Sequence, residues 1–231
     1  MKPFDFHIHS HYSADGLAAP AQIVEEAEAK GMYAIAVTDH GAELSVGINP
    51  YSINAYLEEL KNLQKESSIP LLIGFELNIV DRYGNIDLPE PLLSKIEFPI
   101  ASIHYLREAS APQQLARSYL ERAKMCIERF PVAALGHPFF LHRSLLPFLS
   151  REDIEEFLDL MADKRVTIEV NAKYNTPSPD FIKLCIHKGV KLSVGSDAHI
   201  AAEVGKVHGI FRRLSKLGVK EEDLVINEFV K

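Results

Sequence analysis

Histidine and acidic side chains recur along this sequence, each just after a short apolar run. His7 and His9 close the first run, and later runs are followed by His40, Glu76, His104, His137, Asp197 and His199. From His9 to His137 the spacing is about 30 residues, the length of one strand–helix–strand unit. Imidazoles and carboxylates gathered in one cleft are costly to desolvate unless a cation compensates them, and divalent metals are the usual compensation. The pattern therefore predicts a metal site.

The sequence His7-Ile8-His9 supports this interpretation. Side chains two residues apart on a strand project to the same side, so both imidazoles are expected to face inward and to chelate one ion. No cysteine accompanies these ligands. A set of nitrogen and oxygen donors suits zinc, manganese or iron, without a sharp preference among them.

Apolar, β-branched runs alternate with amphipathic segments, which predicts strands alternating with helices. The expected strands lie near 4–9, 33–38, 71–77, 98–103, 132–136, 166–171 and 191–196, and the expected helices near 20–30, 53–66, 112–129, 151–163, 179–188 and 203–217. This alternation implies right-handed βαβ units around a parallel sheet. We expect one α/β domain over residues 1–231 that closes into a seven-stranded (β/α)7 barrel.

An open doubly wound sheet is the competing architecture. Its usual nucleotide-binding motifs, GxGxxG and GxxxxGK[ST], follow none of the expected strands. In a barrel of parallel strands, all carboxyl ends meet at one face, which hosts the active site. The histidines and carboxylates at the strand ends are therefore expected to converge there.

Composition narrows the classes of function. The chain has 231 residues, 47% of them hydrophobic and 25% charged, with a formal net charge of −7. The longest basic cluster is Arg212-Arg213, too little for a polyanion-binding stripe, so nucleic acid is expected only as a small or end substrate. No apolar run reaches a signal peptide or membrane span, so we expect a cytoplasmic protein without a membrane partner. Cys126 and Cys185 are expected to be reduced thiols.

The polar residues stand in short blocks with a fixed order. The blocks are His7-x-His9-Ser10, Tyr12-Ser13-x-Asp15-Gly16, Thr38-Asp39-His40, Gly74-x-Glu76, Ser102-Ile103-His104, Gly136-His137-Pro138, Glu169-Val170-Asn171 and Ser196-Asp197-Ala198-His199. In this order they resemble the PHP superfamily, named for polymerase and histidinol phosphatase, and most closely its stand-alone trinuclear-metal phosphatases. The module attached to family X DNA polymerases is also similar, but this chain has no polymerase domain. The resemblance implies a distorted, TIM-like barrel.

The resemblance also implies three divalent metal ions per chain, with zinc, manganese or iron as candidates. The implied ligands are His7, His9, Glu76 and Asp197 for the first ion, Glu76, His104 and His137 for the second, and Asp15, His40 and His199 for the third, with Glu76 as the bridge. Histidine often replaces Asp15 in trinuclear-zinc phosphatases. A carboxylate is a harder ligand and favours manganese or iron, or weaker binding, at the third site. Asp39 is expected to orient an imidazole.

The implied activity is a metal-dependent phosphoesterase that hydrolyses a small phosphomonoester, such as histidinol phosphate or a nucleotide, by a metal-bridged hydroxide. The implied catalytic residues are Glu76 as the bridge, Asp197 as a proton acceptor, and His199 at the leaving oxygen. Lys173, just past the sixth expected strand, is the best-placed side chain to hold the phosphate. Weaker candidates lie in loops: Arg82, Arg107 and Arg143.

Two other classes stay open. One is a phosphodiesterase or 3'-5' exonuclease acting on nucleic-acid ends, although net acidity disfavours a processive nuclease because polymer tracking needs an electropositive groove. The other is a catalytically silent metal-binding module, which the intact ligand set disfavours. An amidohydrolase is a more distant possibility, since its usual bridging residue is lysine whereas Glu76 holds that place here.

Overall fold

Seven parallel strands follow one another in chain order in the computed structural model, which describes residues 1–106 and 111–230. Within these residues the strands are β1 (Phe4–Asp5), β2 (Ala34–Val37), β3 (Leu71–Asn78), β4 (Phe98–Ser102), β5 (Ala134–Leu135), β6 (Thr167–Asn171) and β7 (Leu192–Gly195). Every neighbouring pair is parallel. The predicted (β/α)7 barrel is confirmed.

The barrel closes where β1 meets β7. The Phe6 amide donates to the Val194 carbonyl at 2.9 Å, and the Asp197 amide donates to the His7 carbonyl at 2.9 Å. Ile8 forms a parallel bridge with Ala198 just beyond. We call this contact the seam. Regular pairing of β1 ends at Asp5, earlier than the predicted 4–9, but the chain continues along β7 through these seam contacts.

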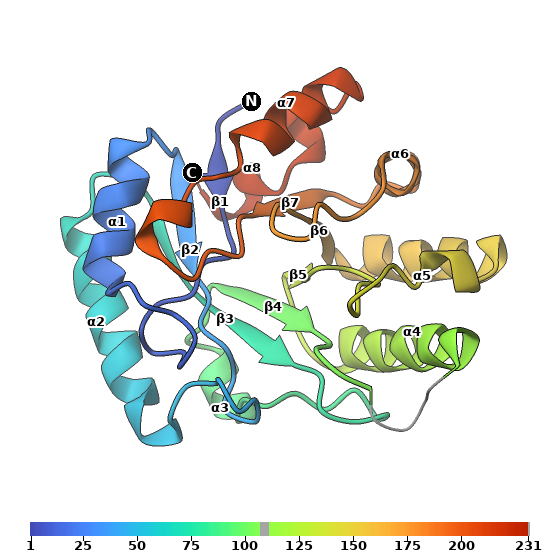
Figure 1. Cartoon of the computed structure of the whole chain (residues 1–231), viewed down its shortest axis with the longest axis horizontal. Coiled ribbons are helices and arrows are strands. Elements are labelled where there is room, and N and C mark those ends of the chain that lie inside the picture. Colours follow the sequence, from blue (N-terminus) through green and yellow to red (C-terminus); the bar gives the residue numbers. More distant parts are fainter. Residues whose placement is uncertain (107–110, 231) are drawn as a thin grey trace.

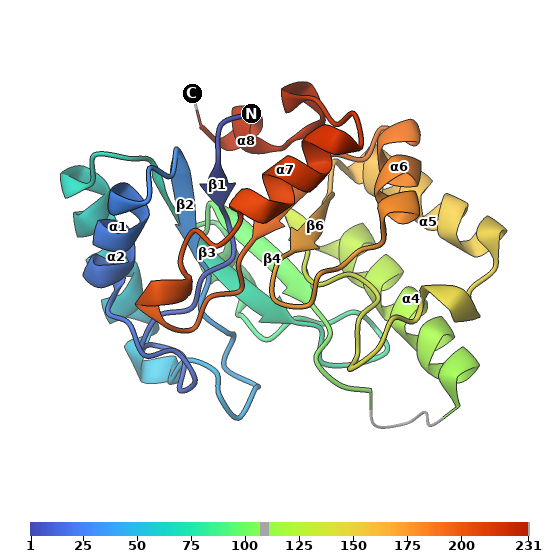
Figure 2. The same cartoon turned by 45° about the horizontal axis from the view of Figure 1, so that its top comes forward.

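Helices surround the strands (Figures 1 and 2). They are α1 (Pro20–Ala29), α2 (Ile53–Glu66), α3 (Glu90–Leu93), α4 (Pro112–Arg129), α5 (Arg151–Lys164), α6 (Pro179–His187), α7 (His208–Lys216) and α8 (Ile226–Phe229), with 3-10 turns η1 (Pro50–Ser52), η2 (Leu146–Phe148), η3 (Ala201–Glu203) and η4 (Glu221–Asp223). Five predicted helices agree to within one residue. The last differs, because η3 and a turn at Gly205, whose φ is 71°, delay the start of α7 until His208.

Each long helix turns an apolar stripe toward the strands. In α2, Ile53, Tyr56, Leu57 and Leu60 are buried, at the spacing of one helical face. The Tyr56 hydroxyl donates to the Val37 carbonyl, so the buried polar atom is satisfied. All eight residues of β3 are buried. The core thus lies between the strands and the helices.

A buried carboxylate fastens the seam. Asp5 accepts hydrogen bonds from the Ser196 and Gly205 amides, both at 2.8 Å, and burial raises its pKa to about 6. Cys126 and Cys185 are buried free thiols, as expected. Among the described residues, no helix is both long and apolar enough to cross a bilayer.

Candidate metal centre

Glu76 on β3 lies at the centre of the polar residues found at the carboxyl ends of the strands. Its side chain is 1% exposed and its two oxygens face different imidazoles. Oε2 lies 3.4 Å from His7 Nε2, 3.6 Å from His9 Nε2 and 2.7 Å from His40 Nδ1. Oε1 lies 3.3 Å from His104 Nε2 and 2.9 Å from His137 Nε2. One carboxylate thus joins two groups of histidines.

Two more carboxylates extend this cluster. Asp197 Oδ1 lies 3.6 Å from His9 Nε2 and 3.5 Å from His199 Nδ1. Asp15 Oδ2 lies 3.5 Å from His40 Nε2 and 3.2 Å from His199 Nε2. All nine residues proposed as ligands from the sequence therefore lie in one connected cluster, which we call the metal centre. Asp197 reaches it through a left-handed backbone, with φ of 55°, at the end of β7.

The donor atoms fit divalent ions better than they fit hydrogen bonds. His40 Nδ1 and Glu76 Oε2 are buried without a hydrogen-bond partner although they lie 2.7 Å apart. Nitrogen and oxygen ligands lie about 2.0–2.2 Å from zinc, so neighbouring ligands of a tetrahedral ion are about 3.3–3.6 Å apart. Most of the spacings above fall close to that range. Three groups could each hold an ion: His7, His9 and Glu76; His40, Glu76 and His104; and His9, His40 and His199.

The buried carboxylates of the metal centre require positive charge close to them. Burial alone would raise the pKa of Glu76, but His7, His104 and His40 hold it well below its usual range. Burial alone would lower the pKa of His40, but Glu76 and Asp15 raise it to about 10. Burial and the neighbouring His40 instead lower the pKa of His9 to about 3, so protons on the imidazoles do not compensate the carboxylates throughout the cluster. Divalent ions would supply this positive charge to the carboxylates.

Glu169 on β6 supports the centre from behind and has a role that the sequence analysis missed. It is 1% exposed, its Oε1 lies 2.7 Å from His7 Nδ1, and it accepts hydrogen bonds from the His137 amide and from Asn171 Nδ2. A proton on Nδ1 of His7 leaves Nε2 free to bind a metal. The sequence could have indicated this role, because polar residues occupy every second position of a buried strand. These residues are Thr167, Glu169 and Asn171.

The expectation for Asp39 was wrong. Its carboxylate accepts hydrogen bonds from the Ser10 amide at 2.9 Å, the Ser10 hydroxyl at 2.6 Å and the Ser13 amide at 2.9 Å, rather than contacting an imidazole. Successive residues of an extended chain point to opposite sides, so Asp39 points away from the side of His40. It fixes the loop that carries Asp15.

Lys173 lies at the edge of the metal centre. Its ammonium is 3.2 Å from Asp197 Oδ1 and 3.2 Å from His199 Nδ1, and its side chain is 40% exposed. The other cationic candidates are not brought there. The Arg82 guanidinium donates to the neighbouring Tyr83 hydroxyl, no described contact joins the Arg143 side chain to the cluster, and Arg107 lies outside the described residues.

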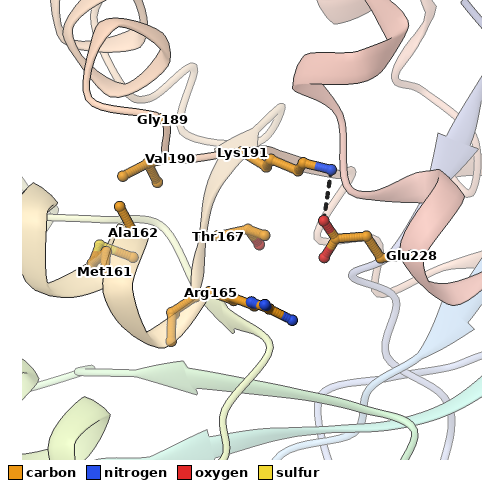
Figure 3. A pocket seen from close by; sticks show the side chains of 9 residues that line it. Met161, Ala162, Arg165, Thr167, Gly189, Val190, Lys191 and Glu228 are labelled. Carbon is orange, nitrogen blue, oxygen red and sulfur yellow. Dashed lines mark ion pairs between the residues drawn. The ribbon is translucent and has the colours of Figure 1, made fainter.

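Two cavities differ in their relation to the centre. A small one of about 80 Å³ adjoins it and is lined by His104, His137, Phe140 and Tyr174, among others. Another, of about 190 Å³, lies at the amino-terminal ends of β6 and β7 (Figure 3). There Lys191 pairs with Glu228 at 2.6 Å, so its charge is compensated. Active sites of such barrels lie at the opposite, carboxyl-terminal face.

Comparisons with known proteins agree with this geometry. A family model described as the PHP domain matches residues 5–173. A probable phosphatase of Caldanaerobacter subterraneus subsp. tengcongensis is 32% identical over 98% of this chain and 87% of its own. A probable histidinol-phosphatase of Thermotoga maritima is 28% identical over 92% of this chain and 91% of its own.

A solved structure shares the fold. The histidinol phosphate phosphatase of Lactococcus lactis, complexed with zinc, L-histidinol and phosphate, aligns with a TM-score of 0.70 over 95% of each chain at 22% identity. The alignment spans almost the whole barrel. At 22% sequence identity, this alignment supports the fold alone.

Proposed function

The chain belongs to the PHP domain family, and from that membership we propose that it is a metal-dependent phosphatase acting on a small phosphomonoester. One observation carries the proposal: the buried Glu76 carboxylate presents one oxygen to His104 and His137 and the other to His7 and His9. A single carboxylate between two sets of imidazoles is suited to bridge two ions.

We assign the ligands in three groups. The first is His7, His9, Glu76 and Asp197, the second Glu76, His104 and His137, and the third Asp15, His40 and His199. His40 approaches both Asp15 and Glu76, so the second and third groups adjoin. Divalent ions held by these residues would lower the pKa of coordinated water toward about 7 and would neutralise charge on phosphate oxygens. The carboxylate of Asp15 favours manganese or iron in the third group.

The remaining chemistry belongs to side chains of this protein. Asp197 is the proposed proton acceptor: Asn171 Nδ2 donates to its Oδ2 at 3.2 Å, which leaves Oδ1 facing the cluster. The half-exposed ammonium of Lys173 is the proposed anchor for a phosphate oxygen. His199, which lies between Asp15 and Asp197, is the proposed group at the leaving oxygen.

A monoester fits better than a nucleic acid. The net charge is −7, and the cavity that adjoins the metal centre has only about 80 Å³. Tracking along a nucleic acid needs an electropositive groove. A small phosphomonoester, whose phosphate would be bound by metal ions and Lys173, needs no such groove.

The deciding experiment is Glu76→Gln, which removes the bridging charge at nearly constant volume. Metal content by elemental analysis is measured with turnover of p-nitrophenyl phosphate and bis-p-nitrophenyl phosphate, each with added manganese or zinc. We expect the wild type to bind metal and prefer the monoester, and the variant to lose metal and hydrolysis. Glu58→Gln, the same change at an exposed position of α2, should behave as wild type.

Three results would contradict the proposal. Full activity and metal content in Glu76→Gln would remove the bridge. Preference of the wild type for the diester would favour a nuclease. Bound metal without turnover of either compound would favour a catalytically silent module.

A further inference from the structure

The cavity of about 190 Å³ that Figure 3 shows lies at the opposite end of the barrel from the metal centre. It is lined by Thr167, the first residue of β6, and by Lys191, which directly precedes β7, whereas Asp197 follows the other end of β7. The proposed chemistry uses none of the residues that line this cavity. Its charged side chains lie on one side and its apolar side chains on the other.

The charged side of the cavity has an excess of positive charge. The side chains that gather there are Arg165, Lys191 and Glu228 (Figure 3). Lys191 Nζ lies 2.6 Å from Glu228 Oε1, so these two charges compensate each other. Within residues 1–106 and 111–230, no hydrogen bond or ion pair engages the Arg165 guanidinium. One positive charge at this cavity is therefore uncompensated.

The backbone at Arg165 has a conformation that glycine takes elsewhere in this chain. Arg165 follows the last residue of α5 with a φ of 57°. The same left-handed turn after α1, α6 and α7 is made by Gly31, Gly189 and Gly218, with φ of 68°, 76° and 83°. Glycine adopts this conformation without steric cost, whereas other residues are strained in it, and such strained residues cluster at ligand sites. The guanidinium is thus placed at the cavity at a cost in backbone energy.

The opposite side of the cavity is apolar. It is formed by Met161 and Ala162 from the last turn of α5 and by Val190 (Figure 3). Met161 and Val190 are buried, and Ala162 is only partly covered. A Cβ atom at Gly189 would meet no atom within 4 Å, so the space beside it is open. A short aliphatic group can therefore rest on this side.

These charges select the chemistry of a ligand. A planar guanidinium donates two parallel hydrogen bonds to the two oxygens of a carboxylate. A single negative charge matches the single uncompensated positive charge. A phosphate monoester carries close to two negative charges at neutral pH and would be repelled by Glu228. The cavity, at about 190 Å³, is smaller than the roughly 300 Å³ of a drug-sized site, so the body of the ligand must be short.

We propose that this cavity is a binding site for a short aliphatic monocarboxylate. Arg165 holds the carboxylate, and the hydrocarbon part lies against the apolar side of the cavity near Ala162. The site is separate from the metal centre, and the inference does not depend on the proposed phosphatase activity. Charge-assisted hydrogen bonds and burial of the hydrocarbon part supply the binding free energy.

The test uses isovalerate and its neutral counterpart of nearly the same shape, isovaleramide. Each is titrated into isotope-labelled, zinc-loaded protein, and binding is followed by the backbone amide signals in NMR spectra. We expect saturable shifts with isovalerate at Arg165, Gly189 and Lys191. Isovaleramide should bind at least about tenfold more weakly, because it lacks the charge that strengthens the hydrogen bonds.

Arg165→Gly removes the guanidinium without endangering the fold. Glycine accepts a φ of 57°, so this variant should unfold at the same temperature as wild type or higher. Its affinity for isovalerate should fall at least about tenfold. Glu228→Gln should bind isovalerate more tightly, because it removes a repelling charge and releases Lys191. Arg212→Ala, which removes an exposed positive charge on α7 outside the cavity, is the matched control and should bind like wild type.

Three results would overturn the site. The first is equal affinity for isovalerate in wild type and Arg165→Gly. The second is equal affinity of wild type for isovalerate and isovaleramide. The third is a set of shifts confined to the surroundings of the metal centre, such as Ser10 and Ser196, which would show that the carboxylate binds zinc instead.

Discussion

At the scale of single residues, Glu169 orients His7, a proposed metal ligand. Its carboxylate lies 2.7 Å from His7 Nδ1 and fixes the tautomer that leaves Nε2 toward Glu76. Removing such a partner typically weakens metal binding by about 10–100-fold. We expect Glu169→Gln to lower metal affinity within that range, measured by competition with a chromophoric chelator. Affinity equal to that of wild type would contradict the role.

Asp87 gives a dependence of stability on pH. It is buried, accepts hydrogen bonds from the Asn78 and Glu43 amides, and its pKa is raised to about 6, chiefly by burial. The ordinary value is about 3.9, so the folded protein binds the proton more tightly than the unfolded chain. The contribution of Asp87 to stability is therefore full below about pH 4 and is lost as pH rises through about 6.

Asp87→Asn removes this titration. Urea unfolding of both proteins at several pH values should show their free energies of unfolding diverging by about 2–3 kcal/mol between pH 4 and 7, with the wild type losing more. Parallel curves would show that Asp87 does not titrate in this range.

Sequence reasoning placed eight of the nine polar residues of the metal centre because they lie at strand ends, which converge in a barrel. Asp15 was implied only by the resemblance to the PHP superfamily. Sequence reasoning did not find the role of Glu169 or the contacts of Asp39. These contacts depend on the direction in which each carboxylate points and on the residues that it meets there. Asp39 contacts Ser10 and Ser13, which lie in another loop. The stacking of Phe140 on Tyr174 was equally hidden, because two separate turns bring the rings together.

At the scale of elements, the close approach of β7 to the centre depends on Gly195. A Cβ atom there would lie 2.3 Å from Glu169 Oε1 and 2.4 Å from His7 Cβ, inside the sheet. Gly195→Ala should destabilise the protein by about 1–3 kcal/mol, the usual cost of overpacking. Gly209→Ala, in α7, meets no atom within 4 Å and should be neutral or slightly stabilising. Thermal unfolding of both variants distinguishes local crowding from a general effect of alanine.

The helices were the most predictable elements, since their apolar stripes and end signals are local in sequence. Ser178 caps α6, whose first residue is Pro179, and Ser150 caps α5 through a capping box with Asp153. The start of α7 and the early end of β1 were not predictable in this way. Both lie at the seam, where Asp5 and Gly205 meet across the fold.

At the scale of the whole molecule, metal binding should stabilise the folded barrel. The proposed ligands come from both sides of the seam and from the strands between. Ligands that bind only the folded state stabilise it by about 2.7 kcal/mol at 100 times Kd. For a chain of this size that is a rise in Tm of about 5–10 °C. We expect this rise with manganese or zinc relative to excess chelator, and none in Glu76→Gln. An equal Tm with metal and with chelator in the wild type would contradict metal binding by the folded protein.

The seam also has a consequence for protein synthesis. His7 and His9 leave the ribosome about 190 residues before Asp197 and His199, and the barrel closes only when the two groups meet. A product of interrupted translation that stops before residue 192 lacks β7, which meets β1 at the seam, and it lacks Asp197, a carboxylate proposed to hold the first ion. Such a fragment can neither close its barrel nor complete that ligand group. Catalytic activity would therefore require translation through β7.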